Sequence, residues 1–346
     1  MKTCRIGVLT ACALAAGALL AGQALAKSKT LDAIKERGAL LCTGHNGSYL
    51  GFAEVDDKGN WTGFDIDLCR ALATAVLGAP DKLKIVPLSF AQRFPSIQSG
   101  DVDVIIKVTG WTMSRDTELG LQFSRPYLLG ATQLMVHKSL GVKTASELNG
   151  ATVCVAGGTS TERLAASYLT SIKVKYELVT YEKSEELRGA YFSKRCDAYA
   201  GWGPNLAVTR ATGSKDPTEH VILPDVLAME PESAGMRQGD DGWVDIVNWV
   251  FSALLDAELN GVTAANVEQM KSNPPNPTVA RLLGQTPGIG QRLDLRDTWA
   301  YDMIKAMGNY GEIFDRTLGK GSKYKLDRGV NALYKDGGVL YPLLLD

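Results

Sequence analysis

Several signatures of common protein classes are missing from this sequence. Its 37 basic and 38 acidic side chains leave a formal net charge of -1, which gives no positive field to attract nucleic acid. The three histidines lie far apart, no two cysteines have C-x-x-C spacing, and neither H-E-x-x-H nor a P-loop occurs. The sequence therefore predicts no metal site, no cofactor and no nucleic-acid partner.

Long apolar runs are absent except at the N-terminus. Residues 1–26 begin with Lys2 and Arg5, continue as an uncharged run rich in Ala, Leu and Gly, and end in Ala-Leu-Ala. This order is typical of a secretory signal peptide cleaved after Ala26, rather than of a permanent anchor. No later stretch has the roughly 18 continuous apolar residues of a membrane span. We therefore expect a mature chain exported to the periplasm.

The rest of the chain alternates between strand and helix patterns in two similar halves. The first half predicts strands over 39–43, 84–88 and 102–106, and helices from Asp65 and over 92–99. The second half predicts strands over 151–155, 176–180 and 197–200, and helices over 162–169 and 184–193. Such alternation predicts an α/β fold in which each lobe has a mostly parallel sheet covered by helices.

The two halves align at one acidic position. Asp103 falls opposite Asp197, each after a short helix and at the start of a strand. A length of 346 residues fits two compact units. We expect lobe 1 to comprise 27–136 and 237–346, the second part including a C-terminal extension, and lobe 2 to comprise 137–236.

Four cysteines remain after signal removal, and they bear on the same division. An even number in an oxidising compartment predicts two disulfides, with four buried free thiols as the alternative. Three pairings are possible. Sequence order favours Cys42–Cys69 and Cys154–Cys196, because each bridge then lies within one predicted lobe.

The sharpest local motif is Gly-Gly-Thr-Ser-Thr-Glu at 157–162, which follows a predicted strand and opens a helix. Unpaired amides at a helix start, together with the hydroxyls of Thr159, Ser160 and Thr161, are suited to bind an anion. An ordinary helix N-cap explains the same residues equally well.

A second motif follows the predicted strand over 102–106. Ligands of open parallel sheets lie at the carboxyl ends of the strands, so Arg115 is placed to grip a carboxylate through two hydrogen bonds, and Thr112 to add a hydroxyl. A surface arginine paired with Asp116 is the alternative. Because the two anion-suited motifs come from different lobes, we favour a site in the cleft between them.

Together these features resemble the periplasmic solute-binding proteins of ABC transporters for polar amino acids, closest to the general L-amino-acid-binding group. The resemblance covers nearly the whole mature chain, and all four mature cysteines match the pattern. It rests on DKGNWTGFD at 57–65, RF at 93–94, QSG at 98–100, WTMSRDT at 111–117, GT at 158–159, RCD at 195–197 and QGDD at 238–241.

This resemblance implies a type II periplasmic-binding-protein fold, in which two lobes joined by a two-strand hinge close on a solute. It implies that Arg115 and the helix start at 159–161 hold an α-carboxylate. It also implies a monomer that delivers a small carboxylated solute, an amino acid in most of the group, to ABC permease subunits in the inner membrane.

Two positions depart from the group's pattern. Trp202 stands where an acidic residue normally holds the ammonium, and Gly110 stands where a hydroxyl residue is expected. A buried ammonium without its acidic partner costs about 3–5 kcal/mol. The ligand therefore either lacks an ammonium, with Lys107 serving a second acidic group, or places a cation on the Trp202 ring. A shift of one or two residues in the alignment and a packing role for Trp202 are the remaining alternatives.

Aromatic residues after the first strand, His45, Tyr49 and Phe52, are expected near the solute, where a ring covers its apolar part. The alternative places Phe52 in the core and His45 in solvent. We expect a binding protein without enzyme activity. The competing function is a lyase on the same scaffold, similar to periplasmic dehydratases that act on prephenate or arogenate, with Glu162 or Lys107 transferring a proton.

Overall fold

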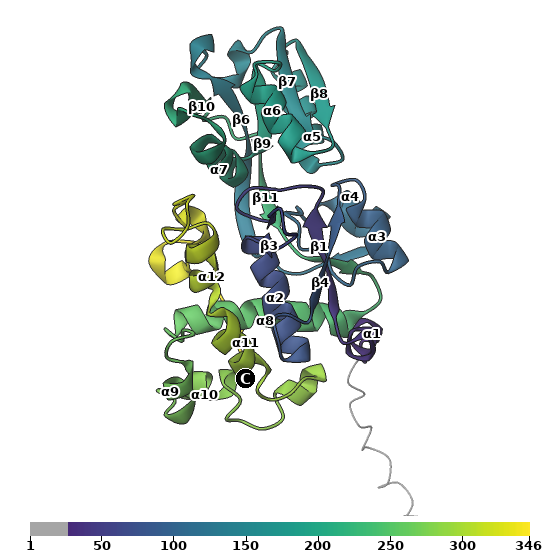
Figure 1. Ribbon diagram of the computed structural model, residues 1–346, viewed down its shortest axis with the longest axis vertical. Helices are drawn as coiled ribbons and strands as arrows, with labels where there is room; N and C mark the ends of the chain where they lie inside the picture. The colour runs from purple at the N-terminus through teal and green to yellow at the C-terminus, as the bar shows by residue number, and fades with distance from the viewer. Residues whose placement is uncertain (1–26) are drawn as a thin grey trace, which may run out of the picture.

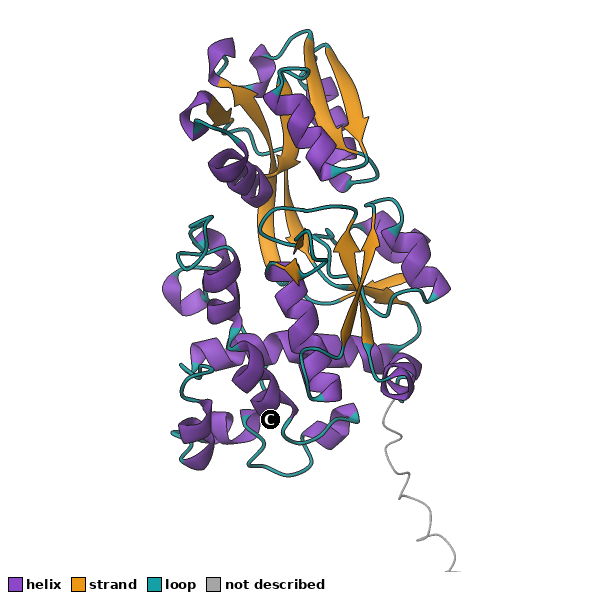
Figure 2. Cartoon of the chain, viewed as in Figure 1, coloured by secondary structure: helices purple, strands orange, loops and turns teal. Residues whose placement is uncertain are grey.

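The computed structural model describes residues 27–346 as two lobes joined by a pair of strands (Figures 1 and 2). The predicted signal peptide and its cleavage site lie outside the described residues. Lobe 1, the lower lobe in Figure 1, contains both ends of the described chain, and lobe 2 lies above it. This is the two-lobed α/β architecture that the sequence predicts.

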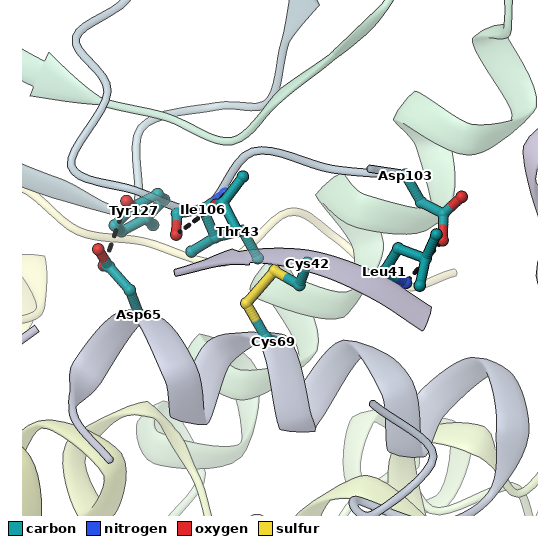
Figure 3. Close-up of a disulfide and its surroundings, with 8 residues drawn as sticks. All are labelled: Leu41, Cys42, Thr43, Asp65, Cys69, Asp103, Ile106 and Tyr127. Atoms are coloured by element: carbon teal, nitrogen blue, oxygen red, sulfur yellow. Dashed lines mark hydrogen bonds between the residues drawn. A yellow bond between two sulfur atoms is a disulfide. The ribbon is translucent and has the colours of Figure 1, made fainter. Parts of the chain in front are cut away.

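The sheet of lobe 1 is built on β1 (Leu40–His45), which pairs in parallel with β4 (Leu83–Leu88). Helix α2 (Phe64–Leu77) packs on it and ends at Gly78, whose φ of 85° is the left-handed conformation that glycine adopts without strain. The Cys42–Cys69 disulfide joins the strand to the helix, with the Cα atoms 6.2 Å apart (Figure 3). The helix from Asp65 and this cysteine pairing are confirmed.

The strand expected over 102–106 is wrong in one respect, because that segment forms only single bridges, Cys42 with Val104 and Ile105 with Gly235. Hydrogen bonds from side chains to the backbone take the place of a regular ladder between this segment and β1 (Figure 3). The Asp103 carboxylate accepts the N–H of Leu41 at 2.7 Å. The Thr43 hydroxyl lies 3.1 Å from both the carbonyl oxygen and the amide nitrogen of Ile106. The segment thus runs beside β1 without becoming a regular strand.

Lobe 2 has β7 (Ala151–Ala156) at the centre of its parallel strands. It pairs in parallel with β8 (Tyr176–Tyr181) on one side and β9 (Ala198–Trp202) on the other. Helices α5 (Ser160–Ser171) and α6 (Ser184–Phe192) connect them, so the three strands and two helices expected here are confirmed. The Cys154–Cys196 disulfide fastens β7 to the residues before β9.

Two antiparallel strands carry the chain between the lobes. The first half of β6 (Leu128–His137) pairs with β11 (Ala228–Glu232), and its second half pairs with β9 in lobe 2. In Figure 1, β11 lies between the two lobes. The hinge therefore consists of β6 and β11, and side chains on these strands lie beside the cleft.

The other helices are mostly in lobe 1, where α2, α8, α11 and α12 surround a core that contains Phe64, Trp243 and Trp299. They are α1 (Lys29–Arg37), α3 (Arg93–Ser99), α4 (Met113–Glu118), α7 (Gly203–Gly213), α8 (Asp241–Leu259), α9 (Val267–Ser272), α10 (Pro277–Leu282), α11 (Trp299–Met307) and α12 (Tyr310–Thr317). The short strands are β2 (Glu54–Val55), β3 (Trp61–Thr62), β5 (Leu121–Phe123), β10 (His220–Ile222) and β12 (Gly235–Arg237). Among residues 27–346, no helix has the length and apolar character of a membrane span.

Candidate functional site

A cavity lies between the lobes and against the hinge strands. Its volume of about 30 Å³ holds two or three water molecules at roughly 10–15 Å³ each, so the lobes are closed on it. The residues that line it are Tyr49, Phe90, Arg93, Val108, Ala156, Thr159, Ser160, Thr161, Tyr199, Ala200, Gly201, Trp202, Asn205, Glu230 and Glu232. Both lobes and the hinge therefore contribute charged, polar and aromatic side chains to one space.

Five residues singled out in the sequence line this cavity: Tyr49, Thr159, Ser160, Thr161 and Trp202. Tyr49 comes from lobe 1 and the other four from lobe 2. The structure thus brings these residues together across the cleft, and their binding roles remain predictions.

The start of α5 faces the cavity. The Thr159 hydroxyl accepts the amide of Glu162 at 3.2 Å, which is a normal N-cap. The Glu162 carboxylate accepts the amide of Gly158 at 2.9 Å. The amides of Ser160 and Thr161 have no intrahelical acceptor at this position. The N-cap and the anion interpretation are therefore compatible, because capping uses only part of the available donors.

Arg115 lies on α4 with 2% of its surface exposed. One guanidinium nitrogen donates to the carbonyl oxygen of Gly110 at 2.7 Å, while Nε and the other terminal nitrogen have no partner within residues 27–346. Arg115 borders an open interlobe groove that it shares with Gly158 and Thr159. Thr112 caps α4 by accepting the Arg115 amide at 3.4 Å, and it borders neither the cavity nor this groove.

Arg93 is a site residue that the sequence did not single out. It begins α3, is 1% exposed, and keeps Nε and one terminal nitrogen without a partner in the described chain. Its guanidinium carbon lies 4.7 Å from the ring centroid of Phe94, and that of Arg115 lies 5.1 Å from the same ring. Burial, and secondly the charge of Arg115, lower the pKa of Arg93. Two buried cations this close favour an anion between them.

Two acidic residues of the hinge were also missed. Glu230 and Glu232 lie on β11, both buried, and both line the cavity. Glu230 accepts hydrogen bonds from the hydroxyls of Thr132 and Ser160. The only signal in the sequence is their spacing of two residues, which places both on one face of a strand. The segment reads Ala-Met-Glu-Pro-Glu, and it lacks the alternation of apolar and polar residues that would predict a strand.

Two predicted ligand residues lie behind the cavity wall. Lys107 is fully buried, and its Nζ donates to the carbonyl oxygen of Gly44 at 3.0 Å and sits 4.8 Å from the Phe90 ring centroid. Phe52 is a core residue whose ring centroid lies 5.4 Å from that of Trp202. Neither residue lines the cavity. Lys107 packs against Phe90 and Phe52 packs against Trp202, and these two rings do line it.

His45 is buried, and the alternative that placed it in solvent is wrong. Its ring stacks on Tyr49 with centroids 4.6 Å apart and meets Phe90 edge-on at 5.0 Å. Burial is the main cause that lowers the pKa of His45, and Lys107 and Arg93 add to it. The neutral imidazole therefore completes an aromatic wall on the lobe 1 side.

The two departures from the family pattern are neighbours of the hinge glutamates. A Cβ atom added at Gly110 would lie 3.1 Å from Oε2 of Glu230 and 3.6 Å from a terminal nitrogen of Arg115. A Cβ atom added at Gly130 would lie 2.2 Å from the indole nitrogen of Trp202, so Trp202 packs directly on the hinge. Gly110 and Trp202 thus shape the space around Glu230.

The lobes also touch outside the cavity lining, through a contact that we call the latch and that consists of Ser48, Glu185 and Arg188. The Glu185 carboxylate on α6 accepts the Ser48 amide at 2.8 Å, and Arg188 donates to the Ser48 carbonyl oxygen at 3.1 Å. Because Ser48 belongs to lobe 1 and α6 to lobe 2, the latch forms only when the lobes are closed.

The chemistry of the site is that of recognition of a charged polar solute. Buried nitrogens of Arg93, Arg115, Trp202 and Asn205 lack acceptors within the described residues, and one oxygen of Glu232 lacks a donor. Unpaired buried polar groups cost about 1–3 kcal/mol each, which a ligand carrying an anionic group offsets on binding. In the same part of the chain, no three His, Cys, Asp or Glu side chains are grouped as metal ligands.

Known proteins share this architecture. The family model of the bacterial extracellular solute-binding proteins, family 3, matches residues 41–262. The chain is 44% identical over 335 residues to the general L-amino acid-binding periplasmic protein AapJ of Rhizobium johnstonii, covering 96% of this chain and 97% of that protein. It is 42% identical over 327 residues to the glutamate/glutamine/aspartate/asparagine-binding protein BztA of Rhodobacter capsulatus, covering 94% and 96%. The structure of an ABC transporter periplasmic binding protein from Brucella ovis with glutathione bound matches with a TM-score of 0.88 and 44% identity, over 92% of this chain and all of that one.

Proposed function

Because the chain belongs to family 3 of the bacterial extracellular solute-binding proteins, we propose that its interlobe cavity captures an amino acid, or a related small carboxylate, by the α-carboxylate. The protein is the solute-binding component of an ABC transporter. Its relatives are periplasmic proteins. We propose the same location here after cleavage behind Ala26, with a monomer that hands its solute to permease subunits in the inner membrane.

The observation that carries this proposal is the set of buried donors around the interlobe cavity, which Arg93 lines, and around the adjoining groove, which Arg115 borders. Arg93 and Arg115 of lobe 1 have guanidinium nitrogens without acceptors in the described chain. Ser160 and Thr161 of lobe 2 line the cavity at the start of a 12-residue helix, whose first amides carry partial positive charge. A carboxylate between them satisfies both sets of donors, which neither lobe does alone.

Closure follows from the same arrangement. A ligand shifts an equilibrium between open and closed lobes only when it binds the closed form more tightly. A carboxylate held by lobe 1 cations gains the lobe 2 amides only after closure. The latch of Ser48, Glu185 and Arg188 adds contacts that do not depend on the ligand, so it favours closure for every solute.

The lyase alternative finds less support. Its two proton-transfer residues are engaged elsewhere, Glu162 with the Gly158 amide at 2.9 Å and Lys107 with the Gly44 carbonyl oxygen at 3.0 Å, and neither lines the cavity. The relatives of high identity are transport-binding proteins. We propose that the protein binds its solute without changing it.

A thermal-shift panel tests this function, because a ligand that binds only the folded state raises the unfolding temperature by mass action. The mature chain is measured with the twenty standard amino acids and with the 2-hydroxy and 2-oxo acid of each. We expect several amino acids to raise the unfolding temperature at micromolar concentration, and prephenate to be recovered unchanged. The absence of any shift with the whole panel, or an aromatic product from prephenate, contradicts the proposal.

A further inference from the structure

The hinge strand β11 carries a pair of buried acidic side chains. Glu230 and Glu232 are two positions apart on β11, so both side chains lie on the same face of the hinge strand. Their exposed fractions are 5% and 2%. A buried carboxylate without a cation is costly, yet neither glutamate is among the ion pairs of residues 27–346.

The two carboxylates differ in what they contact. Both oxygens of Glu230 accept hydroxyl hydrogen bonds, from Thr132 and from Ser160. Oε2 of Glu232 has no donor in the described chain. Burial first, and then the like charge of Glu230, raise the pKa of Glu232 well above its ordinary value, against the opposing effect of Arg115 and Arg93. Glu232 therefore needs a further positive group more than Glu230 does.

The arginines with unpartnered nitrogens and the hinge glutamates are equal in number. Arg93 and Arg115 carry two positive charges, and Glu230 and Glu232 carry two negative charges when ionised. A ligand whose only charged group is a carboxylate pairs with the arginines, but it gives the two glutamates no positively charged partner. A ligand that carries both a carboxylate and an ammonium keeps the balance and provides a partner for each pair.

The glutamates also lie beside the lobe 1 segment that leads to Arg115. The amide of Trp111 donates to the carbonyl oxygen of Pro231 at 3.0 Å, and the amide of Ser233 donates to that of Thr109 at 3.0 Å. These bonds fasten β11 to the segment that contains Gly110 and precedes Arg115. Because Gly110 has no side chain, it leaves space for Glu230 where a larger residue would crowd its carboxylate.

We propose that the hinge-strand carboxylate of Glu232, supported by Glu230, binds the α-ammonium of the ligand and so replaces the acid that Trp202 displaces in lobe 2. The inference rests on the proposed function, and it restricts the ligand to carboxylates that carry an ammonium. Since β11 is bonded to lobe 1, both charged ends of the ligand are recognised on the lobe 1 side, and lobe 2 adds neutral donors on closure.

Calorimetry on the mature chain tests the inference with the tightest-binding amino acid of the panel and with its own 2-hydroxy acid, which keeps the carboxylate and lacks the ammonium. We expect the wild-type protein to bind the amino acid roughly 100-fold or more tightly than the hydroxy acid. The Glu232→Gln variant should lose roughly 100-fold in affinity for the amino acid and keep its affinity for the hydroxy acid. Glu230→Gln should show the same pattern with a smaller loss.

Glu177→Gln serves as the matched control, because Glu177 is exposed on β8 in lobe 2. It should bind both ligands as the wild type does. Retained hydroxy-acid binding by Glu232→Gln shows that the variant is folded, and the unfolding temperature without ligand checks this independently. Equal affinity of the wild type for both ligands, or unchanged amino-acid affinity in Glu232→Gln, overturns the inference and leaves carboxylate capture standing. Failure of every amino acid to bind removes the proposed function instead.

Discussion

Lobe 1 and lobe 2 each place a segment that begins with an aspartate beside a central strand, and this aspartate makes the same two hydrogen bonds in each lobe. Asp103 receives the amide of Leu41 at 2.7 Å, while its own amide donates to the Leu41 carbonyl oxygen at 2.9 Å. Asp197 makes the corresponding two bonds with Thr152, both at 2.8 Å. The alignment of Asp103 with Asp197 in the sequence thus reflects an equivalent position in the fold.

The lobes differ in how they reach the cleft. In lobe 2, β7 leads into α5 after only three residues, which brings the amides at the start of the helix to the cavity. In lobe 1, a long excursion with β2 and β3 separates β1 from α2, and Tyr49 of this excursion lines the cavity together with Phe90 and Arg93. A shared scaffold thus provides charged side chains on the lobe 1 wall and neutral donors on the lobe 2 wall.

The sharpest way to break this asymmetry is to remove a lobe 1 cation. We expect Arg115→Ala to lower the binding free energy of the amino acid by about 3–5 kcal/mol, because it leaves the ligand carboxylate short of a buried ionic partner. Calorimetry measures the loss. Arg195→Ala, at an exposed position in lobe 2, should leave the affinity unchanged, and an equal loss in both variants would contradict a charged wall confined to lobe 1.

The second test uses the pH dependence of a buried carboxyl group in lobe 1. Burial raises the pKa of Asp65 from 3.8 to about 7, against opposing contributions from Lys107 and the hydroxyl of Tyr127. The folded state then holds a proton that the unfolded state releases between pH 4 and 7, so the contribution of Asp65 to the free energy of unfolding falls as pH rises through that window.

Asp65→Asn removes this titration. At about 1.4 kcal/mol per pKa unit, we expect the free energy of unfolding of the variant, relative to the wild type, to rise by about 2–4 kcal/mol from pH 4 to pH 8. Denaturant unfolding at several pH values, with disulfides intact, measures it. Parallel pH profiles for the two proteins would show that Asp65 ionises normally in the folded state.

The shared aspartates give a third and smaller test. Replacing either one by alanine leaves a strand amide without its acceptor, so we expect each variant to lose about 1–3 kcal/mol of stability. Asp103→Ala should lose more than Asp197→Ala, because Asp103 also forms an ion pair with Arg37. Thermal unfolding of both variants beside the wild type measures the difference, and a larger loss for Asp197→Ala would contradict this ranking.

Weakening the latch should have the smallest effect on ligand affinity. Glu185→Gln weakens one exposed hydrogen bond to Ser48, for which we expect at most about 1 kcal/mol, or roughly a fivefold weaker affinity. Because the latch touches no ligand, the loss should be the same for every amino acid that binds. Titrations with two different amino acids check this, and a loss confined to one of them would place Glu185 in the binding site.

The sequence predicts those helices and strands whose formation depends on a local pattern of apolar residues and glycines. The helical spacing of Cys69 and Leu72 with a glycine at 78 defines α2, and a glycine-rich turn after an apolar strand defines the start of α5. Arg93 escaped because one arginine at the start of a short helix resembles any surface residue. The Glu230 and Glu232 pair escaped because their environment depends on β6 and α5, far away in sequence.

We expect groups from both lobes to meet on one carboxylate, and a crystal structure of the mature chain with its tightest-binding amino acid shows whether they do. We predict that the ligand carboxylate lies within hydrogen-bond distance of a guanidinium of Arg93 or Arg115 on one side. On the other side it should meet the amides of Ser160 and Thr161. A carboxylate held by residues of a single lobe would contradict binding across the cleft.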